Sequence, residues 1–206
     1  MSDLKIPQDI LDLCEMIEKS TVGYDVYLGG GFLRDLEYGN NTPKDVDLFF
    51  IPHKGYNLEI IPFCDLGFPV YDYQNPTQDM KDRGVNRVVC FVNKELSTQE
   101  VNYIVYDYGM SIEELARDFD MGINQIVYDI KNKVLYRSDK YVEHHENKVL
   151  ECLHKFSHER MWHRYQRMKA KFPNYSVVGE PSVTLLEEIV YTTSLNIKSK
   201  ASSTSA

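Results

Sequence analysis

The sequence predicts an α+β fold in which helices flank a mixed or antiparallel β-sheet. Three observations carry this prediction: a strand, a glycine turn and a helix follow one another within residues 25–38, β-rich runs occur in pairs with hairpin-length spacers, and amphipathic or capped segments surround them. With 206 residues, of which 43% are hydrophobic, the chain is long enough for one core domain with a small helical appendage.

Local patterns justify the elements in chain order. Apolar residues at helical spacing predict a helix over 7–19, and Ser111 with Glu114 forms a capping box that opens a helix over 111–119. The other expected elements are strands at 25–28, 45–51 and 69–73, helices at 32–38, 59–67, 141–171 and 183–195, hairpins at 85–107 and 124–138, a loop at 74–84 and a disordered tail at 198–206. We therefore predict a head over 1–140, a helical neck-like extension over 141–197, and the tail.

Charge and composition limit the classes of partner. A net charge of −8 argues against a surface that binds nucleic acid throughout, but residues 154–172 carry six lysines and arginines against the single acid Glu159. The four cysteines are spaced singly, so we expect reduced and mostly buried thiols. Because the sequence contains neither a membrane-length apolar run nor a signal peptide, we expect a cytoplasmic protein without a membrane partner.

Two aspartates separated by one valine are the first chemical signal. In a strand, Asp45 and Asp47 project to one face, while Val46 and Leu48 project to the other face and into the core. Two carboxylates at one site repel each other unless a cation lies between them, and a hard divalent ion such as Mg²⁺ prefers oxygen ligands. The alternative is a solvated strand end, where this pattern is also common.

A run of three glycines at 29–31 precedes the expected helix at 32–38. Without side chains, such a strand-to-helix turn lets backbone N–H groups approach a phosphate, although the pattern is neither a P-loop nor a dinucleotide-binding fingerprint. A tight structural turn is the alternative interpretation. The combination of this turn with Arg34 and the aspartate pair favours metal-assisted phosphoryl chemistry.

The same residues carry a family resemblance. The segment GGFLRD at 30–35, followed by PKDVDLFF at 43–50, resembles the head domain of the tRNA nucleotidyltransferase (CCA-adding enzyme) and bacterial poly(A) polymerase family, whose signature is G-G-x-[VL]-R-D and then D-[IVL]-D. The resemblance implies a polymerase-β-like nucleotidyltransferase head followed by a short helical neck. It also implies that Asp45 and Asp47 hold Mg²⁺. The turn residues that it implicates are Gly30 and Gly31, closing on the triphosphate, and Arg34 and Asp35, supporting the turn.

A second segment is similar to another motif of that family, R-R-D-F-T-I-N-A-x-A-Y-D. In FDMGINQIVYD at 119–129, Asp120 and Asn124 fall on the motif aspartate and asparagine. Phe119 stands where an arginine is usual, and Arg117 is the nearby candidate for its contacts to the nucleotide. Without the family, this segment reads as a turn into a hairpin.

The fold implied by the resemblance has a third carboxylate on a strand beside the aspartate pair. Glu100 opens a β-rich run and is our candidate on an antiparallel neighbouring strand, with Asp107 as the competitor. In the neck, basic residues at helical spacing lie beside an apolar stripe. We expect Arg160 and Arg164 to face a nucleotide or RNA, with a solvated basic face as the alternative. The remaining stripe residues are Arg167 and Lys171 on the basic side and Met161, Tyr165, Met168 and Phe172 on the apolar side.

Together with these patterns, the resemblance implies an ATP- or CTP-binding, Mg²⁺-dependent nucleotidyltransferase. It would transfer a nucleotide to an acceptor hydroxyl, most simply at the 3′ end of a tRNA-like RNA, with release of pyrophosphate. A nucleotidyltransferase that modifies a protein or small molecule, and a non-catalytic nucleotide-binding module, are the alternatives. Because relatives that mature tRNA continue through further domains, we expect an oligomer or a partner to supply the missing acceptor-binding surface.

Overall fold

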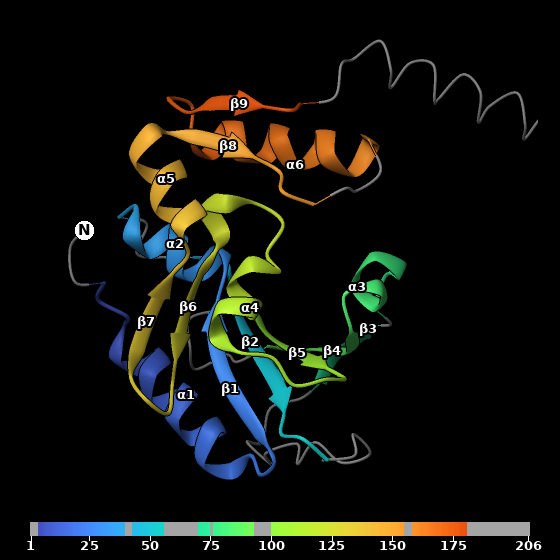
Figure 1. Cartoon of the computed structure of the whole chain (residues 1–206). Coiled ribbons are helices and arrows are strands. Elements are labelled where there is room, and N and C mark those ends of the chain that lie inside the picture. The colour runs from blue at the N-terminus through green and yellow to red at the C-terminus, as the bar shows by residue number, and fades with distance from the viewer. Residues whose placement is uncertain are drawn as a thin grey trace, which may run out of the picture. The chain divides into compact units, whose positions relative to one another are not determined.

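The computed structural model describes residues 4–39, 43–55, 70–74, 76–92, 100–154 and 158–180 (Figure 1). Its contacts divide the chain into two units, Met1–Glu146 and Asn147–Ala206. The strands of the first unit are β1 (Tyr24–Gly29), β2 (Asp45–Pro52), β3 (Val70–Gln74), β4 (Val85–Val92), β5 (Glu100–Tyr106), β6 (Ile126–Asp129) and β7 (Val134–Arg137). Its helices are α1 (Gln8–Ser20), α2 (Gly31–Glu37), α3 (Gln78–Asp82), α4 (Ile112–Arg117), the 3₁₀ turn η1 (Gly122–Asn124) and α5 (Asp139–Asn147).

The strands of the first unit form one mixed sheet in the order β3-β4-β5-β2-β1-β6-β7. The expected hairpins are confirmed as the antiparallel pairs of β4 with β5 and of β6 with β7. The expectation that the strand of Glu100 runs antiparallel to β2 is wrong, because β2 and β5 pair in parallel. β4 is antiparallel to both β3 and β5, so β3 and β5 run in the same direction. β2 also runs in this direction.

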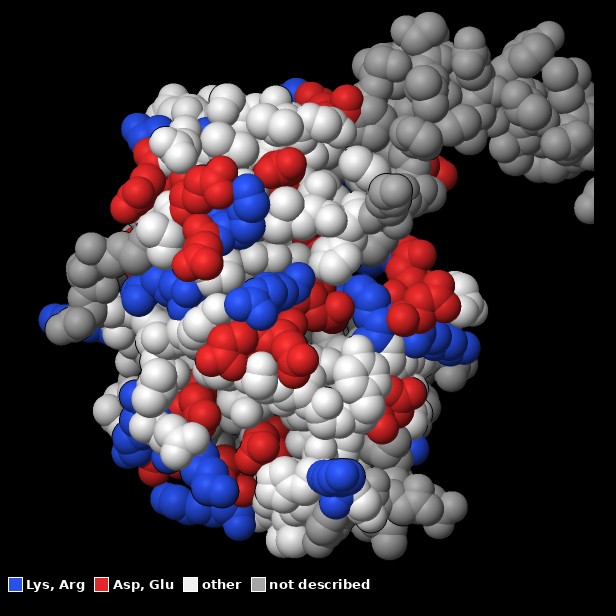
Figure 2. Space-filling view, in the orientation of Figure 1, with Lys and Arg blue, Asp and Glu red and all other residues white. Residues whose placement is uncertain are grey.

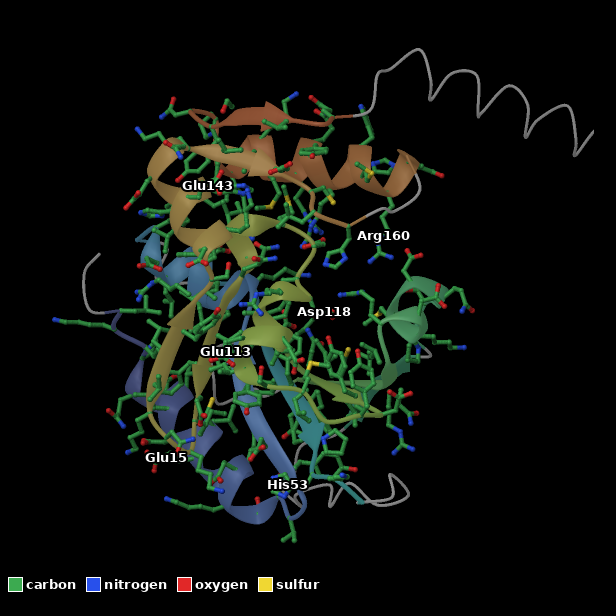
Figure 3. All side chains as sticks on the ribbon, viewed as in Figure 1. Glu15, His53, Glu113, Asp118, Glu143 and Arg160 are labelled. Carbon is green, nitrogen blue, oxygen red and sulfur yellow. The ribbon has the colours of Figure 1, made fainter. Side chains whose placement is uncertain are left out.

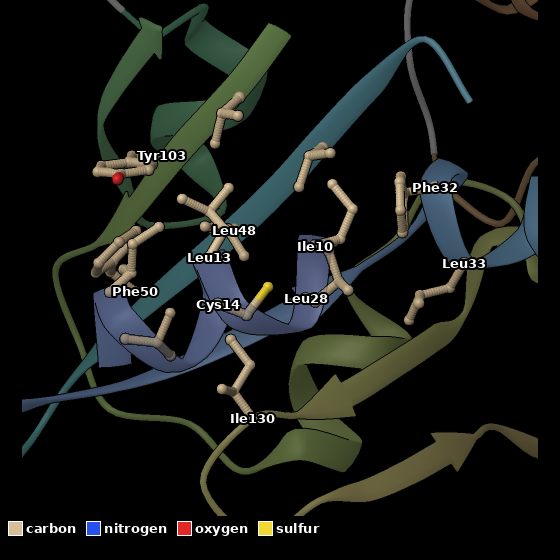
Figure 4. Packing of buried hydrophobic residues seen from close by; sticks show 14 of the residues in the cluster. Ile10, Leu13, Cys14, Leu28, Phe32, Leu33, Leu48, Phe50, Tyr103 and Ile130 are labelled. Atoms are coloured by element: carbon tan, nitrogen blue, oxygen red, sulfur yellow. The ribbon is translucent and has the colours of Figure 1, made fainter. Parts of the chain in front are cut away.

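Alternation along β2 divides the core into two layers. Leu48 and Phe50 belong to the cluster on the face covered by α1 and α2, as Figure 4 shows. Phe49 and Ile51 belong to the cluster on the opposite face, together with residues of α4. The α1 residues buried in the first layer are Ile10, Leu13, Cys14 and Ile17, as the apolar spacing predicts.

Two expected segments differ from the structure, and both differences have a local cause. The segment 74–84, expected as a loop, contains α3, whose first turn is capped because the Thr77 side chain accepts a hydrogen bond from the backbone N–H of Met80. The helix expected over 141–171 is wrong in its middle: α5 ends at Asn147, and Lys148 adopts a left-handed conformation with φ of 53°. The helices expected at 59–67 and 183–195 and the tail lie outside the described residues.

The second unit contains β8 (Val149–Glu151), α6 (His158–Lys171) and β9 (Ser176–Val178), with β8 and β9 paired in parallel. The apolar stripe of α6 is confirmed for Tyr165, Met168 and Phe172, which are buried. The Tyr165 hydroxyl accepts a hydrogen bond from the N–H of Cys152 at 2.8 Å and donates one to the carbonyl of Val178 at 2.5 Å. One hydroxyl thus ties α6 to the segments that carry both strands.

The described cysteines are reduced, as the single spacing of the cysteines predicts. Cys14 and Cys90 are buried free thiols, Cys152 is a partly exposed one, and Cys64 lies outside the described residues. Burial raises the pKa of Cys14 to about 12, which leaves this thiol protonated and unreactive at neutral pH. None of the helices in the described ranges combines the length and apolarity needed to span a membrane.

The Tyr165 contacts generate a stability prediction. Tyr165→Phe keeps the ring in the apolar stripe but leaves a buried donor and an acceptor without their partner, so we expect the second unit to lose about 1–3 kcal/mol of stability. Amide hydrogen exchange of residues 149–151 and 176–178 measures this loss. Tyr136→Phe, on the edge strand β7, is the matched control, and equal protection in both variants would contradict the prediction.

Candidate active site

The predicted carboxylates lie together on one face of the sheet. In the parallel pair of β2 and β5, Asp45 is the register partner of Glu100, and Asp47 is the partner of Asn102. Register partners point to the same face, and the two aspartates share the parity of Phe49, so all four side chains lie on the α4 face. The Asp45 and Glu100 side chains are 37% and 39% exposed. The structure therefore brings three acidic groups to one accessible end of the sheet.

The register also separates the two candidates for the third carboxylate. Glu100 is the first residue of β5 and stands beside Asp45. Asp107 follows Tyr106 at the other end of that strand, and it is not a register partner of β2. The geometry thus favours Glu100 over Asp107 as the third acidic group.

A lysine ammonium lies between two of these carboxylates. Lys44 Nζ is 3.6 Å from Asp45 Oδ1 and 3.9 Å from Glu100 Oε2, which offsets part of their repulsion. The lysine side chain is 79% exposed, so these ion pairs are weak. Asp45 Oδ1 is a buried atom that accepts no hydrogen bond in the described part of the chain.

These groups fit a hard divalent cation such as Mg²⁺. The side chains are negatively charged oxygen ligands, and Asp45 Oδ1 is a buried carboxylate oxygen that accepts no hydrogen bond in the described residues. Within the described ranges, no three histidine, cysteine or acidic side chains are grouped closely enough to hold a metal ion as they stand. Metal binding by Asp45, Asp47 and Glu100 therefore stays a prediction.

The environment of Asp47 differs from that of Asp45. Asn102 Nδ2 donates a hydrogen bond to Asp47 Oδ1 at 2.9 Å. Asn102 lies outside the predicted motifs, although its position two residues after Glu100 places it on the same face of the strand. This periodicity is the signal that could have identified it.

The glycine turn serves two structural requirements. A Cβ on Gly29 would lie 3.0 Å from the Phe119 ring and 3.2 Å from the Phe49 ring, so a larger residue there would need both rings to shift by a few tenths of an ångström. Gly30 has a φ of +72°, which disfavours side chains, and its N–H donates to the carbonyl of Ile126 at 3.0 Å. Gly31 opens α2. Triphosphate binding by Gly30 and Gly31 stays a prediction.

A buried polar network joins the two predicted motifs. Arg34 is 4% exposed, and its Nε donates to Asp35 Oδ1 at 2.8 Å. Arg34 Nη1 donates to Asn124 Oδ1, and Asn124 Nδ2 donates to Asp120 Oδ1 at 3.1 Å. Arg34, paired with Asp35, therefore holds the segment 30–35 against the segment 119–129. The structure places Arg34, Asp120 and Asn124 together, and their binding of a nucleotide stays a prediction.

After the end of α4, Phe119 occupies the position where the family motif has an arginine. Phe119 is 8% exposed, and its ring centroid is 5.0 Å from that of Phe49, so it packs in the core. Asp118, labelled in Figure 3, accepts hydrogen bonds from Arg83 Nη1 at 2.9 Å and from the Tyr106 hydroxyl at 2.7 Å. These contacts fix the residue before Phe119. Arg117 is exposed, and its role in nucleotide binding stays a prediction.

The basic residues of α6 belong to the second unit. Arg160, labelled in Figure 3, and Arg164 are half-buried, whereas Arg167 is exposed. On the face drawn in Figure 2, basic and acidic side chains are interspersed. A surface for an RNA backbone on this face would therefore be local, as the net charge leads one to expect.

Comparisons with known proteins add evidence about the fold. No family model matches this sequence, and no curated protein does. A CCA-adding enzyme in complex with ATP matches with a TM-score of 0.61 at 19% identity, over 84% of this chain and 40% of the other. A CCA-adding enzyme in complex with CTP gives 0.60 at 20% identity, over 93% and 45%. The Thermotoga maritima CCA-adding enzyme complexed with tRNA gives 0.58 at 18% identity, over 88% and 41%.

The chain thus spans less than half the length of these three similar structures, and the similarity concerns the fold. This similarity in fold agrees with the order of the strands, turn and helices that carry the two predicted motifs. This chain therefore shares the fold of the part of these CCA-adding enzymes that it matches.

Proposed function

We propose that this protein is a metal-dependent nucleotidyltransferase that transfers a nucleoside monophosphate from a nucleoside triphosphate to an acceptor hydroxyl and releases pyrophosphate. The observation that carries the proposal is the grouping of Asp45, Asp47 and Glu100 on one sheet face. The fold similarity to CCA-adding enzymes, whose structures include complexes with ATP, CTP and tRNA, supports it. By the same reasoning, the 3′ end of an RNA is the proposed acceptor.

The residues of the chain have distinct roles in this mechanism. Asp45, Asp47 and Glu100 would hold Mg²⁺, which when bound would lower the pKa of the acceptor hydroxyl and neutralise charge on the triphosphate. Arg34 and Asn124 keep the glycine turn in place through their hydrogen bond. Asp45 and Glu100 are more than a third exposed, so a ligand from solvent can reach both carboxylates.

The RNA part of the proposal rests on α6. Arg160, Arg164 and Arg167 recur at helical spacing, and the buried side chain of Tyr165 anchors this helix to its own unit. A helix held in this way can present cationic groups to phosphates without losing its packing. ATP and CTP are both retained as candidate donors.

The first prediction concerns nucleotide and metal binding. Titration calorimetry with ATP and with CTP should show binding in Mg²⁺ that weakens when EDTA is added, since the carboxylate face repels a triphosphate unless a cation lies between them. Absence of binding for every nucleoside triphosphate at millimolar concentration would contradict the proposed function.

The second prediction separates charge from shape at the carboxylates. Asp45→Asn or Asp47→Asn keeps the side-chain size but removes a negative charge, so pyrophosphate release should be abolished. The melting temperature in EDTA should stay equal or rise, because repulsion between carboxylates is relieved. The matched control is Asp25→Asn, which should keep the parental transfer rate. Asp25 is the register partner of Ile51, at the end of β2 away from Asp45 and Asp47. An Asp47→Asn protein with near-parental transfer rate would refute the mechanism.

The third prediction tests the basic face of α6. Replacing Arg160, Arg164 and Arg167 with glutamine should weaken binding of a single-stranded RNA and flatten its salt dependence by about 0.7 per lost phosphate contact in the logarithmic slope. Fluorescence anisotropy over a series of salt concentrations measures both quantities. A triple variant of Lys19, Lys133 and Lys140 to glutamine has the same charge change elsewhere on the chain. Equal effects in the two triple variants would show a non-specific charge effect only.

A further inference from the structure

We propose that Asn102 is a positioning residue that orients the Asp47 carboxylate for metal binding. This inference rests on the proposed function and assigns a role to a residue outside the predicted motifs. Its basis is the hydrogen bond from Asn102 Nδ2 to Asp47 Oδ1, at 2.9 Å, between side chains that are register partners on β2 and β5.

The chemistry of the contact determines its direction. A carboxylate only accepts hydrogen bonds, so the NH₂ group of Asn102, and not its carbonyl, faces Asp47. The amide also carries no charge. It can therefore restrict rotation of the carboxylate without neutralising it, whereas a lysine or arginine in this place would compete with a metal ion for the same negative charge.

The strand arrangement makes Asn102 a rigid donor. β5 is hydrogen-bonded to β2 on one side and to β4 on the other, where Cys90 is the register partner of Asn102. The two neighbours in sequence, Val101 and Tyr103, are buried on the opposite face at 3% and 4% exposure. The backbone that carries the amide is thus fixed from both sides, and little conformational freedom remains to be lost when a ligand binds.

Electrostatics also favour an amide side chain at position 102. Asp45, Asp47 and Glu100 occupy three positions of a two-by-two set of register partners, and Asn102 occupies the fourth. A fourth carboxylate there would add repulsion and would leave Asp47 facing a second acceptor in place of a donor. The asparagine limits the negative charge of the face and orients one of its members.

The test measures metal affinity directly. Mn²⁺ is the probe, and electron paramagnetic resonance of the free ion reports its binding to the parent protein, Asn102→Ala and Asn102→Val. Hydrogen-bond partners of metal-ligating carboxylates typically change metal affinity by about 10- to 100-fold, so we expect a loss of that size in both variants. The valine variant preserves strand propensity in case the alanine variant folds poorly. Asn86→Ala, an exposed position on β4, is the matched control and should bind Mn²⁺ as the parent does.

A second readout distinguishes positioning from a general structural effect. At saturating metal, the KM for the nucleotide and the melting temperature in EDTA of the Asn102 variants should stay close to those of the parent, while the metal concentration for half-maximal transfer should rise about 10- to 100-fold. Parental Mn²⁺ affinity in both Asn102 variants would overturn this inference alone. A parent protein that binds no Mn²⁺ would overturn the proposed function and the inference together.

Discussion

The parallel register between β2 and β5 is the constraint on which the site depends. It places Asp45 beside Glu100 and Asp47 beside Asn102, and alternation along the strands keeps these four groups on one face. A slip of one residue would turn the aspartates toward α1 and would move Val46 and Leu48, which are fully buried, to the α4 face. Hydrophobic burial on one face thus fixes the positions of the charged groups on the other.

The second constraint is polar and links parts of the chain that are far apart in sequence. Arg34 and Asn124 are separated by 90 positions, yet their side chains are hydrogen-bonded in the interior. A buried guanidinium is costly unless it is paired, and Asp35 provides the opposite charge at 2.5 Å. Because each group satisfies the other, α2 and the η1 segment are held together.

Phe119 is the main departure of this chain from the motif that it resembles. In the resemblance an arginine stands at this position, but here the phenyl ring fills the space next to Gly29 and Phe49. A glycine that the sequence suggests as part of a phosphate-binding turn is therefore also favoured by aromatic packing. Asp118, held by Arg83 and Tyr106, determines where that ring enters the core.

The sequence by itself determined the features that depend on residues close together in the chain. The capping box of Ser111 and Glu114, the apolar spacing of α1, the two hairpins and the alternation of β2 are local, and each is present in the structure. Only the tertiary structure decided the direction of β5 and the contact of Asn102 with Asp47, 55 positions away. Strand direction and register depend on how the intervening chain crosses the sheet, and periodicity within one strand contains no information about that path.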